Sequence, residues 1–129
     1  MSDTKIKVLV TDDEADFRQV MVFWLNSKGY DVIQVDSGQA ALKAIKEITP
    51  DIVFLDLNMP GMDGVDVLKE IRAFNQDLPV IIISAYVESA RLKEAEPYGV
   101  SGIFYKGGDF KDGLNLLETT LRTHKKLKK

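Results

Sequence analysis

The chain has no cysteine and only one histidine, and both scarcities narrow the chemistry it can perform. Without cysteine there can be no disulfide, thiol nucleophile or thiolate metal ligand, a composition that fits a cytoplasmic protein. The single histidine, His124, lies in a basic C-terminal stretch, where a surface position is expected. With no second histidine, a Ser-His-Asp catalytic arrangement is not expected.

Long hydrophobic runs are also missing. The first ten residues, MSDTKIKVLV, begin with charged side chains and contain only a short apolar run that lysines interrupt. Neither a signal peptide nor a membrane anchor has this pattern. We therefore expect a cytoplasmic protein with no membrane-spanning segment.

Positive charge is scarce except at the C-terminal end. Of the 17 Lys and Arg residues, five lie in the last eight positions, against 20 Asp and Glu residues elsewhere in the chain. An acidic body disfavours direct nucleic-acid binding and favours a cation site. The length of 129 residues predicts one domain, 1–124, followed by a basic tail, 125–129, which could begin a linker to an output domain outside this sequence.

Short β-branched runs alternate with longer segments of helical period. Strands are expected at 5–11, 30–35, 51–56, 79–84 and 102–106, and helices at 14–28, 38–48, 64–75, 88–96 and 110–125. Gly29, Ser37, Asp63 and Asp109 are the expected helix stop and cap residues. Strict alternation with strands that are apolar on both faces predicts a parallel sheet covered by helices on both sides.

Chemically active side chains stand where four of these strands end. Asp12 and Asp13 follow the first strand, and Asp56, Ser84 and Lys106 close the third, fourth and fifth. Three carboxylates at one sheet edge repel one another unless a cation is present, and an all-oxygen set suits magnesium, manganese or calcium better than zinc. A lysine and a hydroxyl beside such a metal favour phosphoryl transfer, with a carboxylate as the candidate nucleophile.

The stretch DLNMPGMDG, 56–64, is the most specific segment of the chain. Pro60 restricts the backbone, Gly61 permits a tight turn, and Asp63 is placed to cap the next helix. The expected result is a short, stiff loop beside Asp56 that can aim a backbone carbonyl at a metal ion.

These pieces together resemble the receiver domain of response regulators in two-component signalling, over about residues 5–123. The resemblance rests on VTDDE (10–14), FLDLNMPGMDG (54–64), IIISA (81–85) and the lysine of FYKGG (104–108). It implies a flavodoxin-like (βα)5 three-layer fold with a five-stranded parallel sheet of order 2-1-3-4-5. It also implies a signalling receiver whose only catalysis is its own phosphorylation and dephosphorylation.

The resemblance assigns a role to each residue of the magnesium or manganese site. Asp56 would be the phosphoacceptor and would also bind the metal. Asp13 would bind the metal directly, Asp12 mostly through water, and Asn58 through its backbone carbonyl.

The phosphoryl group would contact Ser84, Ala85 and Lys106, while Asn58 would flank it and, with Tyr86, set the lifetime of the phosphorylated state. The donor would be a phosphohistidine on a sensor kinase or phosphotransfer protein. The signal would pass to a downstream protein or output domain through the face formed by the fourth helix, the fifth strand and the fifth helix. In relatives that face is the usual dimer surface.

Two departures from the family pattern fall in the stretch GIFYKGGDF, 102–110. Gly107 follows the lysine where most receivers have a proline, commonly with a cis bond, so either Gly107 adopts an unusual backbone conformation or the loop takes another path. The usual aromatic switch residue is replaced by Ile103. Tyr105 lies on the same side of the strand as Ile103 and is the candidate to replace it, with core packing as the alternative.

Three other functions are alternatives to phosphorylation. A degenerate receiver could switch partners without a phosphoryl group, although the intact acids, hydroxyl and lysine disfavour it. A phosphatase or mutase of the haloacid dehalogenase type would need a second aspartate where Asn58 stands, and a flavin site would need a glycine-rich loop in place of Asp12 and Asp13.

Overall fold

The computed structural model describes residues 5–85 and 90–124. Within them, five strands alternate with five α-helices as the hydrophobic pattern predicts. The strands are β1 (Lys7–Thr11), β2 (Asp31–Val35), β3 (Ile52–Asp56), β4 (Val80–Ser84) and β5 (Gly102–Tyr105). The helices are α1 (Ala15–Ser27), α2 (Gly38–Ile48), α3 (Gly64–Phe74), α4 (Ala90–Ala95) and α5 (Phe110–Thr123), with a 3-10 turn, η1 (Glu96–Tyr98), after α4.

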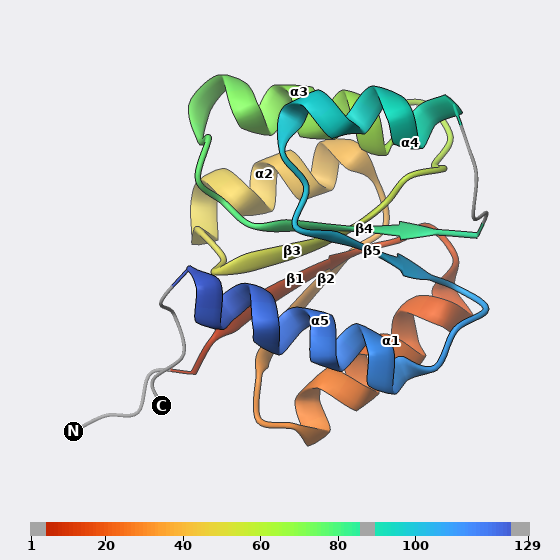
Figure 1. Ribbon diagram of the computed structural model, residues 1–129, viewed down its shortest axis with the longest axis vertical. Helices are drawn as coiled ribbons and strands as arrows, with labels where there is room; N and C mark the ends of the chain where they lie inside the picture. Colours follow the sequence, from red (N-terminus) through yellow and green to blue (C-terminus); the bar gives the residue numbers. More distant parts are fainter. Residues whose placement is uncertain (1–4, 86–89, 125–129) are drawn as a thin grey trace.

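The strands form one parallel sheet of order β2-β1-β3-β4-β5, which confirms the predicted flavodoxin-like topology. Helices α2, α3 and α4 cover one face of the sheet, and α1 and α5 cover the other (Figure 1). Because the chain runs from β1 outward to β2 and then returns past β1 to β3, strand order reverses between β1 and β3. Ligands of such sheets bind beyond the carboxyl ends of the strands at this point.

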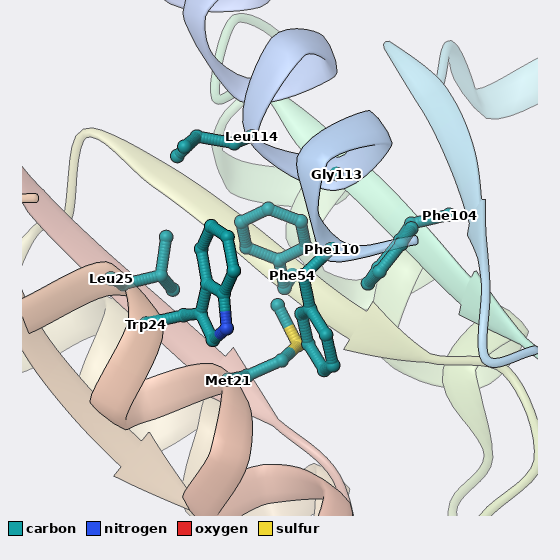
Figure 2. A pocket seen from close by; sticks show the side chains of 8 residues that line it. All are labelled: Met21, Trp24, Leu25, Phe54, Phe104, Phe110, Gly113 and Leu114. Atoms are coloured by element: carbon teal, nitrogen blue, oxygen red, sulfur yellow. The ribbon is translucent and has the colours of Figure 1, made fainter. Parts of the chain in front are cut away.

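Two apolar layers hold the sheet between the helices. The larger layer lies against α2, α3 and α4 and includes Leu55, Leu68 and Ile82. The other lies against α1 and α5 and is partly aromatic: Met21 and Trp24 from α1 meet Phe110 from α5 around a small apolar pocket (Figure 2). Burial of these side chains is the main stabilising contribution to the fold.

The helix boundaries follow the predicted cap residues. The side chains of Ser37, Asp63 and Asp109 accept hydrogen bonds from backbone amides in the first turns of α2, α3 and α5. Gly29 has φ 93°, a left-handed conformation that suits glycine and follows the end of α1. The predicted fourth helix ends sooner than expected as regular α-helix, because the 3-10 turn with Pro97 near its start follows Ala95.

None of the helices in the described residues combines the length and hydrophobicity that a membrane crossing requires.

Candidate functional site

Three aspartates meet at the carboxyl edge of the sheet. Asp12 directly follows β1 and Asp56 ends the neighbouring strand β3; both are buried, and Asp13 is exposed beside them. Each offers a carboxylate oxygen, and these oxygens lie within 4.8 Å of one another. The fold thus brings together the three acids that the sequence placed at strand ends.

Asp12 is fixed by the start of α1. Its Oδ1 accepts a hydrogen bond of 2.8 Å from the Glu14 amide, and Arg18 Nη1 donates to its backbone oxygen at 2.8 Å. The other carboxylate oxygen, Oδ2, is buried and accepts no well-directed hydrogen bond, but it lies 3.2 Å from the Lys106 ammonium. The ammonium compensates part of the charge of this oxygen, and a bound metal ion would add a direct contact to it.

Asp56 carries an unfavourable charge in this setting. Burial, followed by the repulsion of Asp12, raises the pKa of Asp56 to about 7. The Lys106 ammonium and the Asn58 amide, which donates to Asp56 Oδ1 at 3.1 Å, act in the opposite direction. A divalent cation beside the two carboxylates would remove most of this repulsion.

Lys106, at the end of β5, supplies the positive charge of the site. Its Nζ lies 3.2 Å from Asp12 Oδ2 and 3.4 Å from Asp56 Oδ2, and it also contacts Glu14 Oε1. Nζ lies 5.1 Å from the centre of the Phe17 ring as well. Burial alone would lower the pKa of Lys106, but the hydrogen bond to Glu14 and the charges of Asp56 and Asp12 raise it above its ordinary value.

The loop between β3 and α3 is as tight as its sequence predicts. Gly61 has φ 76°, and Asp63 forms a reciprocal capping box with Asp66 at the start of α3. The Gly64 amide donates to the Leu57 oxygen at 3.0 Å, so the helix begins directly against the end of β3. This holds the Asp56 backbone in place.

Ser84 and Ala85 lie at the end of the neighbouring strand. Ser84 is fully buried, and its backbone oxygen accepts a 2.8 Å hydrogen bond from the Lys106 amide. Ala85 is exposed and lines an open pocket with Glu14, Phe17, Lys106 and other residues of the α1 start. Tyr86, the other candidate modulator besides the exposed Asn58, lies outside the described residues.

The chain after Lys106 forms a tight turn with trans peptide bonds. The Gly108 amide donates to the Tyr105 oxygen at 2.9 Å, which closes a turn with Lys106 and Gly107 at its centre. Among the described residues no peptide bond is cis, and Gly107 does not have a positive φ. A left-handed Gly107 is thus excluded, and the trans turn agrees with the second alternative, another loop path, because proline is disfavoured at the third position of such a turn.

Ile103 and Tyr105 both lie partly buried on β5. Ile103 packs against the core layer under α2, α3 and α4, and Tyr105 follows it by one strand period. An isoleucine in this packed position has no ring to exchange between buried and exposed rotamers. The assignment of a switching role to Tyr105 stays a prediction.

Sequence reasoning missed the three α1 residues around the site. Glu14 begins the expected helix 14–28 and ends the motif VTDDE, with no site role predicted for it, yet its side chain reaches Lys106. Phe17 and Arg18 fall within the same expected helix without a predicted site role, yet Phe17 contacts the Lys106 ammonium and Arg18 contacts the Asp12 backbone. The only indication in the sequence is that Glu14 is a third acid directly after Asp12 and Asp13. This pattern does not show which of the three contacts Lys106.

Comparison with protein-family models identifies the family of the chain. The model of the response regulator receiver domain matches residues 8–118. The chain belongs to this family. The resemblance identified from the sequence motifs is therefore confirmed.

Individual relatives agree. Sporulation initiation phosphotransferase F of Bacillus subtilis (strain 168) is 34% identical over 103 residues, covering 80% of this chain and 83% of that protein. Transcriptional regulatory protein ZraR of Escherichia coli (strain K12) is 35% identical over 125 residues, covering 96% of this chain but only 28% of the relative. The solved receiver domain of NtrX from Brucella abortus is 30% identical, with a TM-score of 0.84 and coverage of 90% of this chain and 98% of that one.

Proposed function

We propose that this receiver accepts a phosphoryl group on Asp56 from a phosphohistidine of a sensor kinase or phosphotransfer protein. An Asp56 carboxylate oxygen attacks phosphorus, the P–N bond to imidazole breaks, and the imidazole leaves with a proton. The observation that carries the proposal is the placement of Asp56. It is a buried carboxylate flanked by two further acids and by an ammonium 3.4 Å away.

Magnesium is the proposed metal, with manganese as the alternative. The site offers only oxygen ligands, from three carboxylates whose oxygens lie within 4.8 Å of one another, so the donor set fits a hard cation. Asp12, Asp13, Asp56 and the Asn58 carbonyl would hold it. When bound, such an ion neutralises charge on the carboxylates and on the transferring phosphoryl oxygens.

The phosphoryl group would be held by this chain's own donors. Lys106 would pair with one phosphoryl oxygen, the Ser84 hydroxyl would donate to another, and the Ala85 amide would line the pocket. Lys106 and Ser84 are already linked through the backbone hydrogen bond between β4 and β5. Movement of either side chain would therefore bias the packing of β5 and its neighbouring helices, through which a downstream protein or output domain is controlled. Asn58 and Tyr86 would set the rate at which water removes the phosphoryl group.

The test is covalent labelling at Asp56. With acetyl phosphate and magnesium, mass spectrometry should detect one phosphoryl group on the wild type and none on Asp56→Asn, and beryllofluoride should bind only the wild type. Asp31→Asn, which removes an exposed acid on β2, is the matched control and should label normally. Absence of any adduct on a folded wild type that binds magnesium would refute phosphorylation and favour a receiver that switches without it.

A further inference from the structure

Lys106 is held by one carboxylate that does not belong to the acid triad. Glu14 is the N-cap residue of α1, but its side chain makes no capping hydrogen bond to that helix. The side chain instead reaches across to β5 and contacts Lys106 Nζ, 92 residues away in the sequence. The Glu14 amide donates to Asp12 Oδ1 at 2.8 Å, which fixes the Glu14 backbone beside the acid triad. The Glu14 carboxylate caps no helix amide and is available for the lysine.

The three acids that share the ammonium lie at different depths. The side chains of Asp12 and Asp56 are buried, whereas that of Glu14 is 62% exposed, and Lys106 is 15% exposed between them. Glu14 therefore holds the lysine from the solvent side of the pocket. A phosphoryl group on Asp56 would approach the same ammonium from the buried side.

We propose that Glu14 is a positioning residue that holds Lys106 at the pocket rim in the unmodified protein and competes with the phosphoryl oxygens for it. The inference rests on the proposed function, because it concerns the group that Asp56 would carry. Two effects act in the same direction. The contact between the Glu14 carboxylate and the Lys106 ammonium must break before the phosphoryl oxygens can take its place. The negative charge of Glu14 also repels an incoming anion. Glu14 thus weakens the phosphorylated state and slows its formation.

The matched control is provided by the same helix turn. Asp16 is exposed and lines the same open pocket as Glu14, but among the described residues the ion pairs of Lys106 are with Asp12, Glu14 and Asp56 and not with Asp16. Glu14→Gln and Asp16→Asn each remove one negative charge while keeping the side-chain shape. Only Glu14→Gln removes charge from the atom that contacts the lysine.

The experiment measures beryllofluoride affinity at saturating magnesium for the wild type and both variants. Glu14→Gln should raise the affinity roughly two- to fivefold, the range expected for an ion pair with one exposed partner, and the gain should persist in high salt. Asp16→Asn should change it less, and that change should vanish in high salt. Equal effects of the two variants, or a lower affinity of Glu14→Gln, would overturn the proposal.

A double-mutant cycle separates competition for Lys106 from a general effect of charge. In a Lys106→Met background, where higher beryllofluoride concentrations are needed, Glu14→Gln should no longer raise the affinity beyond what Asp16→Asn does. A gain as large as in the Lys106 background would refute the role of the lysine. Failure of the wild type to form any adduct would instead refute phosphorylation itself, and this inference with it.

Discussion

The Cα of Gly64 lies so close to the Asp56 backbone that a Cβ added to Gly64 would stand 2.5 Å from the Asp56 carbonyl oxygen. It would also stand 2.7 Å from the Leu57 Cα. Both obstacles are backbone atoms at the end of a buried central strand, so neither can move without moving the site. The start of α3 and the candidate phosphoacceptor therefore form one rigid unit.

Gly64→Ala is expected to destabilise the protein and disturb the site together. Overpacking against backbone should lower the free energy of unfolding by about 2–3 kcal/mol, measured by urea denaturation. Beryllofluoride binding should weaken in the fraction that remains folded. Gly107→Ala is the control, because a Cβ there meets nothing within 4 Å and φ is not positive, so stability should stay within about 0.5 kcal/mol. A fully stable Gly64→Ala would contradict the rigid unit.

Arg72 on α3 should be the strongest single anchor at the opposite end of the sheet. Its guanidinium donates to four backbone oxygens, those of Tyr98 at 2.6 Å, Leu78 and Gly99 at 2.9 Å, and Asn75 at 3.0 Å. It thereby joins the loop before β4 to the loop before β5. Arg72→Ala removes all four bonds and should cost roughly 2–4 kcal/mol in thermal or urea unfolding.

The comparison of Arg72→Lys with Arg72→Ala tests whether geometry or charge matters. A lysine keeps the charge but cannot reproduce the planar guanidinium that reaches four acceptors. Arg72→Lys should therefore recover less than half of the unfolding free energy that Arg72→Ala loses. Lys69→Ala removes an exposed cation from the same helix and should be nearly neutral. Full rescue by lysine would show that the four carbonyl contacts contribute little.

Hydrophobic periodicity predicted the strands, and strand ends predicted the triad, because both depend on local sequence and on the geometry common to parallel sheets. The partners of Arg72 and Glu14 could not be predicted in this way. They are backbone oxygens and an ammonium brought close by the helix packing angles, which no local pattern encodes. The turn at Gly107 is an intermediate case: the missing proline showed that the usual path was unavailable, but only the fold shows the trans turn that replaces it.

Asp13 should control magnesium affinity without controlling stability in the absence of the metal. Asp13 is exposed yet lies within the triad, so Asp13→Asn removes a ligand while disturbing no buried group. A roughly tenfold loss of affinity would reduce the stabilisation by excess magnesium by about 1.4 kcal/mol. The measurement is the magnesium-dependent shift of the melting temperature. Asp16→Asn should retain the wild-type shift, and equal shifts in the two variants would exclude Asp13 as a ligand.

The pH dependence of stability without metal should identify the ionised Asp56 carboxylate as the main group that destabilises the folded protein. Its pKa is raised from 3.8 to about 7, so the folded protein binds the proton more tightly than the unfolded chain does. The stability that this provides is complete below about pH 4 and is lost as the pH rises through about 7. In EDTA, the free energy of unfolding of Asp56→Asn should therefore exceed that of the wild type by on the order of 2–4 kcal/mol at pH 8 and by little at pH 4. Asp31→Asn should follow the wild type throughout, and a constant difference between Asp56→Asn and the wild type would show that the carboxylate charge is not its cause.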